Sequence, residues 1–151
     1  MKLAKEKIIL KIYNYEGRLK FEGEYLNGER NGKGKEYYSN GKVRFEGEYL
    51  NGKLWNGKGY NNYSNIEYEM KNGKGYVKKY DNYGNLLFEG EYLNGDKNGK
   101  GKEYNDNGEL IFEGEYLNGE RLNGKGKEYN DYGELIFEGD YINGEKNGKV
   151  K

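Results

Sequence analysis

Residues 21–28 read Phe-Glu-Gly-Glu-Tyr-Leu-Asn-Gly, and this stretch recurs along the chain. It begins again at Phe45, Phe88 and Phe112, and a variant, Phe-Glu-Gly-Asp-Tyr-Ile-Asn-Gly, begins at Phe137. The successive steps are 24, 43, 24 and 25 residues. A second motif, Asn-Gly-Lys-Gly, accompanies it and begins at Asn31, Asn56, Asn72, Asn98 and Asn123. A period of this size predicts a stacked array of one supersecondary unit.

Each unit has the signals of a β-hairpin. Leu19 to Leu26 alternates apolar and polar residues and is rich in aromatics, which is typical of a strand. Asn27-Gly28 follows, and this pair favours a type I′ turn, in which both central residues need positive φ. Lys33 to Tyr38 can return as a second strand. Because the connections are short, we expect an all-β fold, an elongated single-layer antiparallel meander of stacked hairpins.

Alternation along the strands assigns their faces. Phe21, Gly23 and Tyr25 share one face, and a consistent pairing sets the glycines of the returning strand beside these rings. The same register places Lys33 and Lys35 near glutamates on the other face. Such opposite-charge pairs across strands contribute about 0.2–1 kcal/mol each.

Composition limits the function. The chain has 151 residues, with 26 basic and 26 acidic side chains, so its formal charge is zero. This balance argues against a nucleic-acid binder. The hydrophobic fraction is 33%, but aromatics reach 16% and include 18 tyrosines, so a thin sheet with a tyrosine-rich face can fold.

Cysteine and histidine are both missing from the sequence. Histidine is the commonest general base, and both residues are common metal ligands. The remaining candidate groups repeat in every unit, whereas an active site is singular. We therefore expect a non-catalytic protein, with no catalytic residues, no metal site and no cofactor.

Three local patterns resemble chemical sites, and each has a simpler structural interpretation. The carboxylate pair Glu22 and Glu24 recurs with lysines nearby, which favours solvated charge ladders. Gly-Lys-Gly-Lys lacks the spacing and the Ser or Thr of a phosphate loop. The segment 81–85 lacks the frame of a calcium loop, so an Asx-type turn is expected there. The sequence has no apolar stretch of about 20 residues and its charged start is unlike a signal peptide, so we expect a cytoplasmic protein.

The motifs resemble the MORN repeat family, whose pattern is roughly aromatic-x-Gly-x-aromatic, a turn glycine and then Gly-x-Gly. The pattern is matched in register at Phe21, Gly23, Tyr25, Gly28, Gly32 and Gly34, and again at Phe112, Gly114, Tyr116, Gly119, Gly124 and Gly126. The turns and linkers also resemble the MORN-like repeats of bacterial antitoxin components. The resemblance implies a scaffold, dimerisation module or adaptor, and phospholipid binding has been proposed for the family.

The resemblance sets the domain organisation. Residues 1–18 are expected to include a cap strand, and residues 19–151 to form an array of five or six units. The unit near 60–85 is irregular, because only 16 residues separate Asn56 from Asn72 and Phe-Glu-Gly-Glu-Tyr is missing between them. This irregularity indicates either a decayed unit or a local change of curvature that makes a partner site.

We expect the array to mediate protein–protein interaction, including self-association through edge strands such as the one near Tyr141. A thin sheet is expected to leave its aromatic face partly exposed, and aromatic stripes are typical of interfaces. The predicted partner-binding residues are Tyr25, Tyr49, Trp55, Tyr92, Tyr116 and Tyr141. The alternative is peripheral binding to anionic phospholipid through lysine rows. Its predicted residues are Lys33, Lys58, Lys100 and Lys125.

Overall fold

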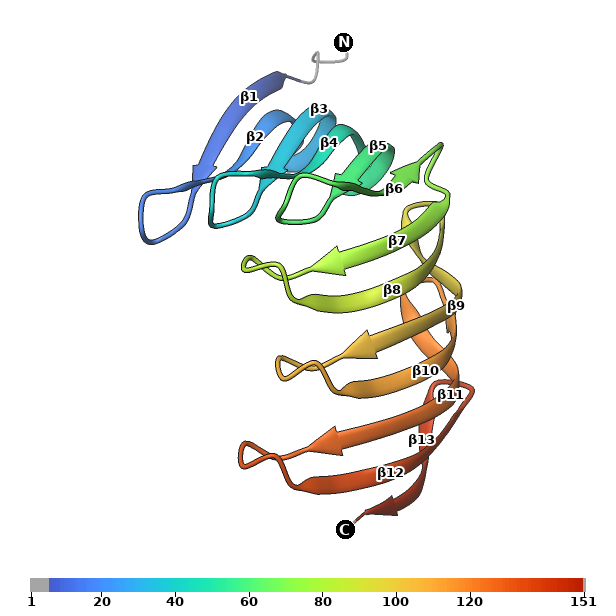
Figure 1. Cartoon of the computed structure of the whole chain (residues 1–151). Helices are drawn as coiled ribbons and strands as arrows, with labels where there is room; N and C mark the ends of the chain where they lie inside the picture. The colour runs from blue at the N-terminus through green and yellow to red at the C-terminus, as the bar shows by residue number, and fades with distance from the viewer. Residues whose placement is uncertain (1–5, 151) are drawn as a thin grey trace.

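The chain folds into a succession of antiparallel hairpins, which confirms the predicted all-β meander, and its strands form two sheets (Figure 1). The computed structural model describes the backbone of residues 6–150 and the side chains of residues 6–147, and these residues include no helix. The first sheet contains β1 (Lys7–Tyr13), β2 (Leu19–Leu26), β3 (Glu29–Tyr37), β4 (Val43–Leu50), β5 (Lys53–Tyr60) and β6 (Ile66–Met70). The second contains β7 (Gly75–Tyr80), β8 (Leu86–Leu93), β9 (Asp96–Tyr104), β10 (Leu110–Leu117), β11 (Glu120–Tyr129), β12 (Leu135–Ile142) and β13 (Glu145–Val150).

The Asn-Gly pairs form the predicted turns. Asn27 and Gly28 have φ of 52° and 79°, and the other hairpins repeat this left-handed pair. Each hairpin tip also binds the tip before it: the Gly52 amide donates to the Arg30 carbonyl at 2.8 Å. These bonds hold the tips in a row along one side of the array.

A row of glycines crosses each sheet in direct register. Gly23 faces Gly34, and their backbones are so close that a Cβ on Gly23 would lie 2.6 Å from the Gly34 Cα. The row in the first sheet runs Leu10, Gly23, Gly34, Gly47, Gly57 and Met70. The row in the second sheet runs Val77, Gly90, Gly101, Gly114, Gly124 and Tyr141. At both ends of each row a residue with a side chain takes the place of glycine.

Aromatic rings cover these glycines, as the alternation predicted. A Cβ on Gly34 would lie 2.8 Å from the Phe21 ring and 2.9 Å from the Tyr49 ring. Phe21 and Tyr49 meet edge to face at 5.5 Å, a favoured geometry for aromatic pairs. The same contacts recur around Phe112, which is 0% exposed. The core is therefore one layer of interlocked rings lying on bare backbone.

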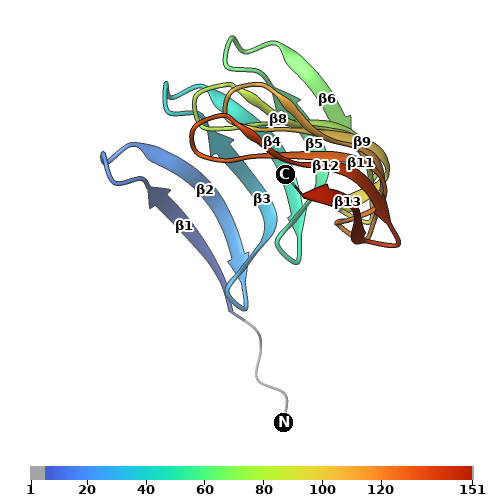
Figure 2. The ribbon, with the colours of Figure 1, turned by 90° about the horizontal axis from the view of Figure 1, so that it is seen from below.

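The two sheets meet at the irregular unit. Met70 and Val77, each 1% exposed, occupy the ends of the two glycine rows, and between β6 and β7 the described pairing is the single bridge from Lys71 to Lys74. The Asn72-Gly73 turn keeps its place in the row of tips, because the Gly73 amide donates to the Trp55 carbonyl at 2.9 Å. The chain changes direction at this junction (Figure 1), and the end view shows strongly curved strands on either side of it (Figure 2).

The outer edges of the two sheets also differ from one expectation. The strand that carries Tyr141, β12, is paired on its far side with β13, so it has no free edge. At the other end β1 pairs with β2 through Leu10 and Gly23 and forms the first strand of the array.

Candidate interaction surfaces

The predicted aromatic stripe is the core of the fold. Tyr49, Tyr116 and Tyr141 are 4%, 3% and 7% exposed, and Tyr25 and Tyr92 are half-buried. The expectation that this face stays partly exposed is therefore wrong at Tyr49, Tyr116 and Tyr141, whereas Tyr25 and Tyr92 keep part of their surface exposed. Trp55 is also half-buried and lies against the junction turn, where a Cβ on Gly73 would be 2.6 Å from its ring.

Cationic side chains cover the rings. The Arg30 guanidinium carbon lies 3.9 Å from the centre of the Phe21 ring, and the Lys97 ammonium lies 4.4 Å from that of Phe88. Such cation–π contacts are worth about 0.5–2 kcal/mol. The cation comes two residues after the turn glycine in four hairpins, at Arg30, Lys97, Arg121 and Lys146. This regular spacing in the sequence could have predicted that cations cover the aromatic face.

Carboxylates accept hydrogen bonds from two of the buried tyrosine hydroxyls, those of Tyr49 and Tyr116. The Tyr116 hydroxyl donates to Glu103 at 2.6 Å, and Arg121 forms an ion pair with Glu103 at 2.7 Å. Burial raises the pKa of Tyr116, and the Glu103 charge raises it further, so the phenol stays protonated. Burial opposes ionisation of Glu103, but the bonds from Arg121 and Tyr116 prevail and lower its pKa. These polar groups are therefore satisfied within the chain.

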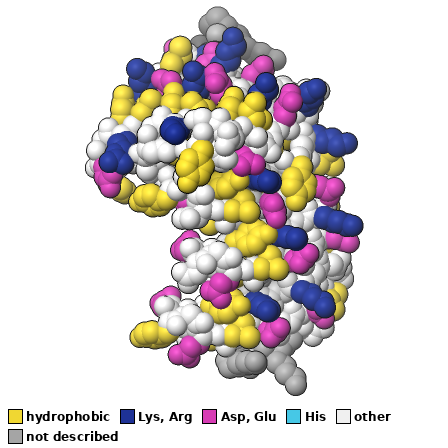
Figure 3. Space-filling view, in the orientation of Figure 1, with side chains coloured by type: hydrophobic (Ala, Val, Ile, Leu, Met, Phe, Trp, Pro, Cys, Tyr) yellow, Lys and Arg dark blue, Asp and Glu magenta, His cyan; other side chains and the backbone are white. Residues whose placement is uncertain are grey.

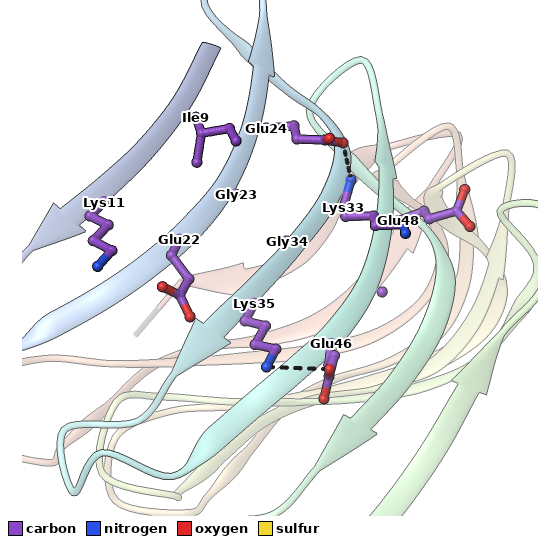
Figure 4. A pocket seen from close by; sticks show the side chains of 11 residues that line it. Ile9, Lys11, Glu22, Gly23, Glu24, Lys33, Gly34, Lys35, Glu46 and Glu48 are labelled. Carbon is purple, nitrogen blue, oxygen red and sulfur yellow. Dashed lines mark hydrogen bonds and ion pairs between the residues drawn. The ribbon is translucent and has the colours of Figure 1, made fainter. Parts of the chain in front are cut away.

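The opposite face carries the predicted lysine and glutamate ladders. Across β3 and β4, Lys33 faces Glu48 and Lys35 faces Glu46, with a 3.5 Å ion pair in the second case. Over Gly34 the two rows leave a shallow groove of about 470 Å³ (Figure 4). The space-filling view shows basic and acidic side chains alternating beside a column of hydrophobic ones (Figure 3).

The four lysines of the lipid alternative are exposed on this face. Each has carboxylates directly opposite it. Lys58 lies between Glu46 and Glu69, and Lys125 lies between Glu113 and Asp140. The structure thus places cations and anions together in every row, and no row is purely basic among the described strands.

Exposed aromatic and apolar side chains lie at positions that strand alternation did not single out. Tyr63, Tyr83 and Tyr132 are exposed at the tips of the loops that join consecutive hairpins. In β1, Ile8, Ile9 and Leu10 are 48%, 77% and 37% exposed. Three consecutive apolar residues on a first strand were a readable signal, because an interior strand has Gly-Lys-Gly at these positions.

Among the side chains of residues 6–147, no group of three or more acidic residues is arranged to hold a metal ion. No helix long and apolar enough to cross a membrane occurs in this part of the chain.

Comparison with known families agrees with the repeated geometry. The MORN repeat model matches residues 21–43, 88–109 and 137–149. The chain contains MORN repeats. The MORN segments begin with the β2–β3, β8–β9 and β12–β13 hairpins, which have two residues between the turn and Asn-Gly-Lys. In the unmatched β4–β5 and β10–β11 hairpins a third residue is inserted there, Trp55 or Leu122. A search of curated proteins gave no match.

The MORN repeat is a non-enzymatic module that is generally associated with protein or membrane-lipid interaction. In the regular units of this chain, cationic side chains cover the aromatic face, and on the opposite face each lysine row is balanced by carboxylates. Among the described residues, exposed apolar and aromatic side chains occur in β1 and at the loop tips.

Proposed function

We propose that this chain is a non-catalytic repeat scaffold that binds protein, including a second copy of itself, through the open edge of β1. The observation that carries the proposal is the run of exposed apolar residues at this edge, where Ile9 alone is 77% exposed. Tyrosines at the loop tips would add a second, weaker contact surface. The carboxylates and lysines serve as ladders in this account and perform no chemistry.

The edge is suited to β-pairing. One side of β1 pairs with β2, and its other side has no neighbouring strand among the described residues. Unpaired amides and carbonyls of an edge strand are a template for another strand. Two cations oppose such pairing, but Lys7 is held by Glu24 at 3.0 Å and Lys11 faces Glu22. An incoming strand would pair with the free backbone and cover Ile9.

Sedimentation velocity over a wide range of protein concentration tests the proposal. The variant is Ile9→Lys, which places a charge on the edge without removing a buried side chain. The matched control is Leu117→Lys, an exposed apolar residue at a hairpin end. We expect the wild type and the control to associate, and Ile9→Lys to remain monomeric. A wild type that is monomeric throughout, and that captures the same native proteins as Ile9→Lys, would contradict the proposal.

Phospholipid binding is the second candidate, since Lys33, Lys58, Lys100 and Lys125 are all exposed on one face. Attraction to an anionic surface is worth roughly 1 kcal/mol per cation near it. The facing carboxylates would cancel much of this, so we expect little retention on acidic liposomes at physiological salt. Strong co-sedimentation that is lost in Lys58→Glu would favour the lipid function instead.

A further inference from the structure

A cavity of about 270 Å³ lies at the junction of the two sheets, away from the edge of β1. Strands of both sheets contribute to its walls, and polar side chains are among the residues that line it. They include Glu36, Arg44, Tyr49, Tyr68, Lys79 and Tyr92.

The repeat gives Lys79 a regular counterpart in other units. One position in each returning strand faces the phenylalanine of the next strand. In three units it is acidic: Glu36 faces Phe45, Glu103 faces Phe112 and Glu128 faces Phe137. In β7 the residue that faces Phe88 is Lys79. The junction unit therefore has a cation where the regular units have a carboxylate.

That carboxylate has a defined role in two regular units. Glu36 accepts a hydrogen bond from the Tyr49 hydroxyl at 3.0 Å and pairs with Arg30 at 2.7 Å. Glu103 does the same for Tyr116 and Arg121. The next strand's tyrosine is thus anchored by an acid that belongs to the chain.

At the junction this anchor is missing. Tyr92 is the counterpart of Tyr49 and Tyr116, and its hydroxyl has no hydrogen-bond partner among residues 6–147. The Tyr68 hydroxyl likewise has none within the described side chains. Burial, with the charges of Asp96 and Glu36, raises the pKa of Tyr92 to about 12, so at neutral pH it remains an O–H donor.

The charges around the cavity suit an anion. Lys79 is exposed, and its charge is close enough to the inner face to add to burial in lowering the pKa of Lys97. The one carboxylate on the wall, Glu36, is already paired with Arg30 and with Arg44, whose Nε lies 3.4 Å away. The unpaired groups are thus an ammonium and two phenol donors.

We propose that this cavity binds a carboxylate from outside the chain, held by the Lys79 ammonium and the hydroxyls of Tyr68 and Tyr92. The bound group takes the place that Glu36 and Glu103 occupy in the regular units. Its source is either an acidic side chain of a protein partner or a small free carboxylate, since the cavity volume admits both.

Calorimetric titration of the full chain tests this proposal with two probes. The first is succinate, and the second is an acetyl-Gly-Glu-Gly-amide peptide, with the Gln peptide as its matched control. Binding of succinate and the Glu peptide assigns a free carboxylate site, whereas binding of the Glu peptide alone assigns a protein partner. If neither binds, or if the Gln peptide binds as well as the Glu peptide, the proposal is overturned.

Two variants at Lys79 locate the site. We expect Lys79→Ala to weaken binding about ten-fold or more, because it removes a charged hydrogen bond. Lys79→Glu restores the regular unit's own acid, so it is expected to abolish binding while keeping the fold, as judged by circular dichroism. The control Lys20→Glu makes the same charge change at an exposed residue that does not line the cavity. Equal loss in Lys20→Glu would overturn the site. The β1 edge is not involved, so its sedimentation test stands separately.

Discussion

The β8–β9 hairpin and the β6–β7 hairpin share the same Asn-Gly turn, but they differ in the residues that face each other in the middle of the two strands. In β8–β9, Gly90 faces Gly101, and a Cβ on Gly101 would lie 2.9 Å from the Phe88 ring. In β6–β7, Met70 and Val77 end the glycine rows, and the pairing shrinks to one bridge. The sheet thus continues where two glycines face each other under a ring, and it stops between Met70 and Val77, where two side chains take the place of these glycines.

The two hairpins also differ in how they treat polar groups. β9 carries Glu103, which satisfies Tyr116 and Arg121. β7 carries Lys79 at the matching position, and Tyr92 is left without a partner in the described part of the chain. Regular units therefore build the array, whereas the junction has groups available for binding.

The largest expected effect comes from removing a ring of a regular unit. Phe112 is 0% exposed, and Phe112→Ala should lower the free energy of unfolding by about 3–5 kcal/mol. Ile66 is exposed on β6 in the irregular unit, so Ile66→Ala should cost less than about 0.5 kcal/mol. Urea denaturation measures both. Equal losses would show that the irregular unit packs like the regular ones.

A methyl group in the glycine row is the next test. In Gly47→Ala the new Cβ would lie 2.0 Å from the Asn56 carbonyl oxygen, so backbone must move, at about 2–3 kcal/mol. Gly108 has φ of +79° and nothing within 4 Å, so Gly108→Ala carries only the backbone strain, about 1 kcal/mol. If the two variants lose the same stability, close approach is not what requires glycine.

Much of this regular geometry could be predicted from the sequence. The Asn27-Gly28 turn, the pairing of Gly23 with Gly34 and the ring of Phe21 over glycine all follow from period and alternation. Strand alternation predicts the face of the sheet on which a side chain lies, but it does not predict which other side chains cover that face. The burial of Tyr49 depends on Arg30, a cation on the neighbouring hairpin, whose direction alternation does not give.

The junction was harder to predict. Spacing marked residues 60–85 as irregular, but it could not decide between a weakened unit and a break. The break depends on Met70 and Val77, two buried side chains whose cross-strand partners, Gly57 and Gly90, belong to different sheets. The cavity depends on Lys79, whose role is visible only once its register with Phe88 is known.

Low pH should reduce the folding stability of the regular units, because it protonates Glu103. Its pKa is held below the ordinary value of 4.5 in the folded chain, so its stabilisation is present at neutral pH. That contribution is lost as the pH falls from about 4.5 through the folded pKa. Glu103→Gln should cost about 2 kcal/mol at pH 7 and reduce the pH dependence of stability. An unchanged pH profile in the variant would assign the acid sensitivity to other carboxyls.

The smallest expected effect concerns the turns, where the two kinds of hairpin should agree. Asn118 and Asn72 both have φ of 49°. We expect Asn118→Ala and Asn72→Ala to cost about 1 kcal/mol each, because alanine is strained in the left-handed region. Thermal unfolding checks this. A neutral Asn72→Ala would mean that the junction turn is not held as tightly as the others.

Residue-resolved amide hydrogen exchange tests the central claim most directly, that regular units are closed and that free groups lie at β1 and the junction. β9 has a paired strand on both sides, so successive amides should exchange slowly. β1, β6 and β7 each have one full ladder, so we predict that amides facing away from it exchange fast, in alternation along the strand. Uniform protection of β6 and β7, equal to that of β9, would contradict the account, because the array would then be one continuous sheet.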